Sequence, residues 1–147
     1  MAALKVAPNE ASAQQLSAQL WQEWLSAPDQ HAQDLLDEGM QRRGVGDFAG
    51  AIVAFDALIA YCPTYAEGYN QRAFASFLRR DFAAALVDLD EALARRPDHI
   101  GALSGRALTL FGLERDAEGQ DVLRDALELN PWLSERHLLR QPEGEEL

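Results

Sequence analysis

The sequence has few basic residues, one cysteine and no long hydrophobic run. Its 147 residues include 13 lysines and arginines against 24 aspartates and glutamates, which gives a net charge of -11 at pH 7. Because phosphate binding requires a basic surface, this charge argues against nucleic acid and membrane partners and favours basic or neutral ones. Cys62 is the only cysteine, so no internal disulfide is possible. No segment approaches the roughly 18 consecutive apolar residues of a membrane-spanning helix.

Motifs that carry chemistry are also missing from the sequence. His31, His99 and His137 lie far apart, and none has a cysteine or histidine at a metal-binding interval. The sequence has no glycine-rich phosphate loop and no nucleophile elbow. We therefore expect no enzymatic activity, no metal and no cofactor.

The first residues do not resemble a secretory signal. Residues 1–7 are too short and too weakly apolar for one. This favours a cytoplasmic location, or a periplasmic one if an upstream signal segment has been removed.

Prolines recur with a fixed period in the middle of the sequence. Pro63, Pro97 and Pro131 lie 34 residues apart. The same offset aligns small and large residues in phase: Gly39 with Ala73 and Ala107, Ala51 with Ala85 and Gly119, and Phe55 with Leu89 and Leu123. The periodicity therefore indicates three structurally equivalent units.

The composition is that of a folded domain. Its 48% hydrophobic and 25% charged residues are ordinary for a globular domain with a buried core.

Each unit reads as helix, turn, helix and proline stop. Apolar residues follow one another at helical spacing, and proline ends each second helix because it cannot continue the hydrogen-bond ladder. Asp47 and Asp81 are placed to cap second helices, and Asp98 to cap a first helix. The pattern predicts helices over residues 30–43, 47–61, 65–79, 82–95, 99–112 and 116–129.

This pattern resembles the tetratricopeptide repeat, and the clearest copy contains Tyr69, Ala73, Phe82, Ala85, Ala92 and Pro97. The resemblance covers residues 30–131 in three repeats, 30–63, 64–97 and 98–131. It implies an all-α solenoid of helix-turn-helix units. Arg42 and Ser76 depart from the family's large aromatic positions, and Gly119 is expected to weaken packing in the third repeat.

Two flanking segments complete the predicted domain layout. Residues 1–29 are expected to form an N-terminal capping helix, a degenerate half-repeat on the first unit that starts at Asn9 or Ser12 and ends near Leu25. Residues 132–147 are expected to form a short C-terminal capping helix and an acidic tail, since terminal repeats must cover their apolar faces. The layout also resembles small bacterial three-repeat proteins of the family.

In the family, the first helix of each repeat lines a concave groove. Carried onto this sequence, the resemblance implies a peptide-binding groove formed by Met40, Arg43, Asn70, Gln71, Phe74, Phe77, Ser104, Leu108 and Phe111. A groove of this kind suits an amphipathic helix or an extended apolar peptide. The alternative is that Phe74, Phe77 and Phe111 pack internally against neighbouring helices or against the N-terminal helix that contains Trp21 and Trp24.

The resemblance therefore implies an adaptor that binds a protein or peptide without chemistry of its own. The alternative is a self-assembling scaffold, with a possible weak homodimer, whose groove is filled by its own or a neighbour's helix. Family members that grip chaperone tails use basic and amide side chains on the inner helices. The matching positions are Leu36, Met40, Gln71, Gly101 and Gly105, of which only Gln71 is polar, so that activity is not expected.

Overall fold

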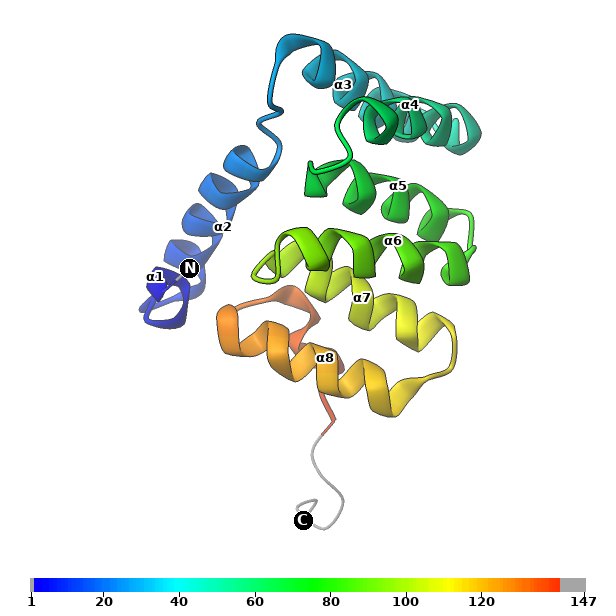
Figure 1. Ribbon diagram of the computed structural model, residues 1–147. Helices are drawn as coiled ribbons and strands as arrows, with labels where there is room; N and C mark the ends of the chain where they lie inside the picture. The colour runs from blue at the N-terminus through cyan, green and yellow to red at the C-terminus, as the bar shows by residue number, and fades with distance from the viewer. Residues whose placement is uncertain (1, 141–147) are drawn as a thin grey trace.

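The computed structural model describes residues 2–140 and confirms an all-α fold within them. Three helical hairpins stack side by side along the chain (Figure 1). They are α3 (Gln30–Gly44) with α4 (Phe48–Tyr61), α5 (Ala66–Leu78) with α6 (Phe82–Arg95), and α7 (Ile100–Gly112) with α8 (Asp116–Leu129). Every predicted end of these helices lies within a residue of the observed one. No helix among the described residues is long and apolar enough to cross a membrane.

Side-chain caps fix where several of these helices begin. Asp47 caps α4 and Asp81 caps α6, each by accepting a backbone N–H from the first turn, as predicted. The capping hydrogen bond from the Gly50 N–H also lowers the pKa of the Asp47 carboxylate. The predicted cap at Asp98 is wrong. The neighbouring residue His99 caps α7 instead, with Nδ1 accepting the Ala102 N–H at 3.1 Å.

Small residues lie where the helices cross. Ala73, Ala85 and Ala107 are essentially without solvent contact, which lets neighbouring helices approach closely. Two glycines allow an even closer approach, because a Cβ at Gly39 would overlap the ring of Phe55 and one at Gly119 would overlap the ring of Phe111. The expectation that Gly119 weakens the third repeat is therefore wrong, since an aromatic ring fills the space.

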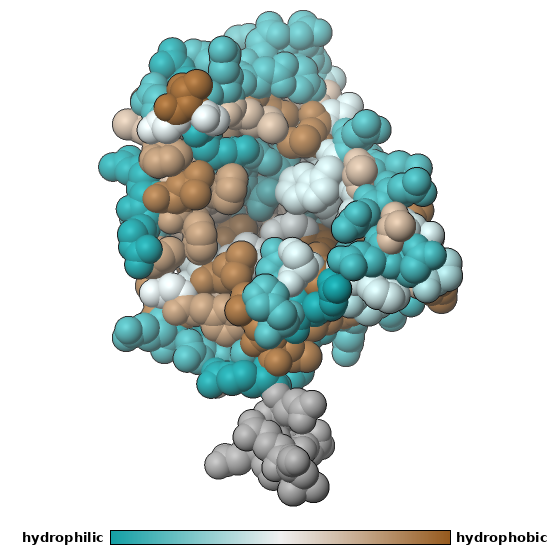
Figure 2. Space-filling model, turned by 180° about the vertical axis from the view of Figure 1, so that it is seen from behind, coloured by the Kyte–Doolittle hydropathy of each residue, from teal (hydrophilic) through white to brown (hydrophobic). Residues whose placement is uncertain are grey.

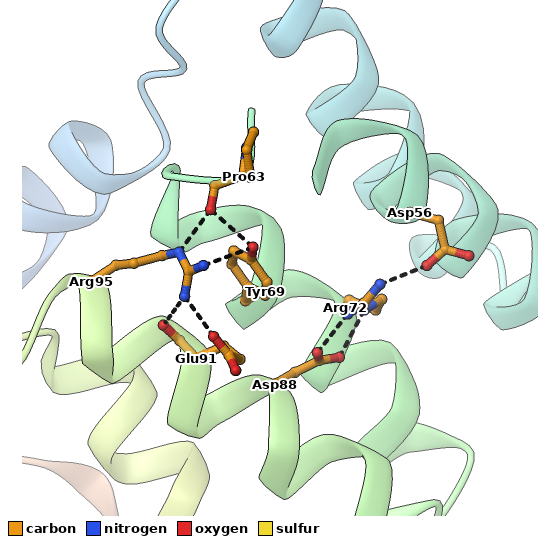
Figure 3. A network of polar contacts seen from close by, with 7 residues as sticks. All are labelled: Asp56, Pro63, Tyr69, Arg72, Asp88, Glu91 and Arg95. Carbon is orange, nitrogen blue, oxygen red and sulfur yellow. Dashed lines mark hydrogen bonds and ion pairs between the residues drawn. The ribbon is translucent and has the colours of Figure 1, made fainter. Parts of the chain in front are cut away.

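Arg72 ties three successive helices together. From α5 it donates two hydrogen bonds to Asp88 of α6, at 2.8 and 2.7 Å, and one to Asp56 of α4 at 2.9 Å (Figure 3). These carboxylates raise the pKa of Arg72, and the bond to Asp88 is the largest cause. Arg106 repeats the contact one unit later with Asp90, at 2.8 Å. The ion pairs thus hold neighbouring repeats in the same register.

A second arginine locks the turn between the first two repeats. Arg95 lies over the ring of Tyr69, 4.1 Å from its centroid, and donates to the Pro63 carbonyl at 2.7 Å (Figure 3). Tyr69 donates its hydroxyl to the same carbonyl at 2.9 Å. The turn is therefore held by α6 and α5 together.

The N-terminal segment forms α1 (Ala2–Lys5) and α2 (Glu10–Trp24), with Asn9 as the cap of α2. Figure 1 shows α2 beside the stack, with its N-terminal end near α8 and its C-terminal end leading up to α3. Its apolar face shares a buried cluster with Ile100, Leu129 and Trp132. The sequence predicts that this helix is a half-repeat on the first unit. In the structure its apolar face lies in the cluster with Ile100 and Leu129 of the third repeat, while Leu25 and Ala27, which follow it, pack against the core of the first repeat.

The C-terminal segment packs on α8, at the end of the stack formed by the third repeat. The predicted closing helix is a 3-10 helix, η1 (Ser134–Leu138). Gln120 of α8 donates to the Leu138 carbonyl at 2.9 Å and accepts the Arg140 N–H at 2.8 Å. The predicted acidic tail, residues 141–147, lies outside the described residues.

Candidate functional site

The first helices of the three repeats, α3, α5 and α7, share one face of the stack. Figure 2 shows this face, where hydrophobic side chains gather in a band next to a hollow. A cavity of about 370 Å³ opens there between the repeats and the N-terminal helix, and we call it the groove. It is lined by Trp21, Leu25, Met40, Arg43, Asn70, Gln71, Ala73, Phe74, Phe77, Leu89, Gly101, Gly105 and Thr109.

The structure brings together only part of the predicted groove. Met40, Arg43, Asn70, Gln71, Phe74 and Phe77 line it. Ser104, Leu108 and Phe111 lie on the next helix of the same row but are not among its lining residues. The third repeat lines the cavity with Gly101, Gly105 and Thr109 instead, and peptide binding by these residues stays a prediction.

The three phenylalanines divide between the two roles that the sequence left open. Phe74 is 48% exposed and Phe77 is half-buried at the groove, with its ring 5.3 Å from that of Phe82. Phe111 is half-buried as well, but it packs over Gly119 against the core cluster of the third repeat and does not line the groove. Phe77 both lines the groove and packs against the core cluster of the second repeat. The position equivalent to Gly119 in the second repeat is Ala85.

This division predicts different effects on stability. Phe111→Ala should lower the free energy of unfolding by about 2 kcal/mol or more, because it removes the ring that fills the space over Gly119 and packs against the core of the third repeat. Phe74→Ala should change it by about 0.5 kcal/mol or less, as is usual for an exposed side chain. Urea denaturation followed by circular dichroism measures both values. Similar losses for the two variants would contradict the assignment of Phe111 to the core.

Among the residues that the structure describes, Arg43 is the only charged side chain that lines the groove. Its guanidinium lies over the ring of Phe74, 4.5 Å from the centroid, and donates a hydrogen bond to Gln71. Burial lowers the pKa of Arg43. Within residues 2–140, no carboxylate oxygen lies within 4 Å of it. The groove thus has one partly desolvated cation on a mainly apolar wall.

A buried polar chain runs beneath the groove. Glu67, 1% exposed, accepts hydrogen bonds from Asn70 at 2.9 Å and from Gln71 at 2.6 Å. Its other oxygen lies 2.7 Å from Nε2 of His99, which is fully buried. Since Nδ1 of His99 accepts the cap of α7, Nε2 carries the proton and donates it to Glu67. Each buried acceptor on this carboxylate therefore has a donor.

Two tryptophans from α2 cover His99. The ring of Trp24 stacks on it at a centroid distance of 4.0 Å, and Trp21 meets it edge-on at 5.4 Å. Tyr65 donates its hydroxyl to the Trp24 carbonyl at 2.9 Å, and burial raises the pKa of this tyrosine. The sequence predicted a capping helix within residues 1–29, but nothing in it identified His99 as the contact of that helix.

Comparisons with known proteins agree with the repeat architecture. No protein-family model matches the sequence. Tetratricopeptide repeat protein 36 of Xenopus tropicalis is 39% identical over 97 residues, which are 65% of this chain and 47% of that protein. Its homolog in Nematostella vectensis is 39% identical over 70 residues, 48% of this chain and 38% of that protein. The chain thus covers less than half the length of either relative.

A solved structure gives the same result at the level of the fold. The first tetratricopeptide domain of Spaghetti (RPAP3), bound to the HSP90 peptide SRMEEVD, superposes with a TM-score of 0.71 at 26% identity. The match covers 73% of this chain and 85% of that one. The 34-residue period, the stacked hairpins and these relatives together show that this chain has the tetratricopeptide-repeat fold.

Proposed function

We propose that the protein binds a short apolar segment of another polypeptide in the groove, without chemistry of its own. The observation that carries the proposal is the placement of Phe74. A phenylalanine that is nearly half exposed, beside a cavity and backed by Arg43, offers apolar surface that the chain itself does not cover. Aromatic anchors of this kind contribute about 2 kcal/mol or more to binding when a partner buries them.

The comparison with RPAP3 supports a peptide as the ligand. That domain has the same fold and holds the seven residues of SRMEEVD. The groove of this chain has a different chemistry, however, because Leu36 is fully buried and Gln71 is already bonded to Glu67. We therefore expect this chain to prefer other sequences to an acidic chaperone tail.

Charge indicates what flanks the apolar side chain in the partner. The protein carries a net charge of -11, which repels acidic segments and attracts basic ones over several ångströms. One side chain of the Leu, Met or Phe type would occupy the groove, and neutral or basic residues would lie on either side of it. The self-assembling alternative stays a prediction, and the chain's own α2 lines the groove without filling it.

The test uses short fluorescent peptides of serine and lysine with one central leucine. Fluorescence anisotropy should show saturable binding of this peptide and much weaker binding of SRMEEVD or of the peptide with a central alanine. Phe74→Ala should weaken binding of the leucine peptide about tenfold or more, the equivalent of a lost anchor.

Val87→Ala provides the matched control. Val87 is 62% exposed on α6, and it is not among the residues that line the groove. It should leave the affinity unchanged. If Phe74→Ala binds as tightly as the wild type, or if the alanine peptide binds as well as the leucine peptide, the groove is not the binding site.

A further inference from the structure

We infer that α2 is a fixed wall of the groove, so that Trp21 contacts the bound segment while Trp24 and His99 position it. This inference rests on the proposed function and extends it, because it places part of the binding site outside the three repeats. A site built from the repeats alone would be lined by α3, α5 and α7 only. The cavity is lined by Trp21 and Leu25 as well.

The ring of Trp21 has one side against the stack. A Cβ at Gly101 would overlap it, so the ring lies directly on the α7 backbone. Trp21 is nevertheless only half-buried, and it lines the same cavity as Phe74 and Phe77. A side chain inserted into the groove would therefore lie between aromatic rings from α2 and from α5, and it would bury apolar surface on both sides.

Continuous contacts link this wall to the opposite rim of the groove. Trp24 stacks on His99, whose Nε2 donates to Glu67. Glu67 accepts from Gln71, and Gln71 accepts from Arg43. Every link is either a ring stack or a hydrogen bond to a buried carboxylate or amide, and such fully satisfied networks are rigid. The distance between α2 and the opposite rim of the groove is thus set by the structure of the protein before any ligand binds.

Buried contacts of α1, α2 and the segment between them distinguish α2 from a movable lid. Leu4 of α1 and Ala13 of α2 are 1% exposed and share the buried cluster with Trp24 and Ile100. The Trp132 indole N–H donates to the Ala7 carbonyl at 3.3 Å. Moving α2 away from the repeats would expose this cluster to water, which is unfavourable in proportion to the apolar area.

The test compares two glycine substitutions and one tryptophan substitution, with the serine–lysine peptide that carries a central leucine as the probe. Gly101→Ala should displace the Trp21 ring and weaken binding about tenfold, although alanine favours the helix. Trp21→Ala should weaken binding to a similar degree. Gly44→Ala is the control, because a Cβ there has no atom within 4 Å and the residue does not line the groove. Its affinity should equal that of the wild type.

Trp24 tests the positioning role separately. Trp24→Ala should weaken binding of the same peptide, and Trp24→Phe should restore it, because phenylalanine keeps a ring stacked on His99. The near-ultraviolet circular dichroism of the tryptophans should follow the same order. If the affinities of the Trp24 variants follow their melting temperatures and not the presence of a ring stacked on His99, the positioning role is overturned.

The outcomes separate this inference from the proposed function. If Phe74→Ala weakens binding while Trp21→Ala and Gly101→Ala do not, α2 is no wall and the groove of the repeats still binds the peptide. Stronger binding by Trp21→Ala would show that α2 obstructs the groove, which also overturns the inference. Failure of the wild-type protein to bind the leucine peptide would overturn both.

Discussion

Replacing His99 by alanine should lower the free energy of unfolding by about 2–5 kcal/mol. Three contributions add: α7 loses its cap, which costs about 0.5–2 kcal/mol, and the buried Glu67 loses a donor, which costs about 1–3 kcal/mol. The ring of Trp24 also loses the surface on which it stacks. Thermal and urea denaturation followed by far-ultraviolet circular dichroism measures the change.

His31 is the matched control for this prediction. It lies on α3, is exposed, and meets only the edge of Tyr61 at 4.5 Å. His31→Ala should change the free energy of unfolding by about 0.5 kcal/mol or less. Equal effects of the two substitutions would show that the Glu67–His99 contact contributes nothing to stability.

Phe55→Ala should have a comparable effect, a loss of about 3–5 kcal/mol, because the ring has no solvent contact and its removal leaves a cavity in the first repeat. The measurement is again the unfolding midpoint and slope in urea. Val53→Ala, on the same helix with a side chain that is 68% exposed, should change stability little.

Gly39 allows a stricter version of this experiment. In the wild type, Gly39→Ala should cost about 1–3 kcal/mol, because the new methyl group meets the Phe55 ring. In the Phe55→Ala background the same change should become favourable by up to about 1 kcal/mol, since alanine is the better helix former. Strict additivity of the two substitutions would mean that they do not contact each other.

The repeat region could be predicted because its contacts are local in sequence. Each hairpin packs on the next at a spacing set by residues 34 positions apart, so Ala73, Ala85 and Ala107 define both the helices and their crossings. The cap of α7 could not be predicted in the same way. Asp98 has the better capping side chain, but Glu67, 32 positions earlier, holds the His99 ring in place.

The positions of Phe77 and Phe111 show that the sequence pattern predicts the candidate site only in part. Phe77 and Phe111 occupy equivalent positions, and the periodic pattern assigns them one role. Their surroundings differ: Phe111 lies over the bare backbone of Gly119, where the second repeat has Ala85, and Phe77 contacts Phe82, where the third repeat has Asp116. Phe77 lines the groove and Phe111 does not.

The sequence by itself determined the all-helical class, the three repeats and the ends of their helices, because helix periodicity, proline stops and small crossing residues act between near neighbours. Only the tertiary structure decided where α2 lies. An apolar helix face shows that a helix is buried, but its partner depends on the surfaces available. Those surfaces are Ile100 at the start of α7, Leu129 at the end of α8, the bare backbone at Gly101 and the ring of His99, all of which the N-terminal segment covers.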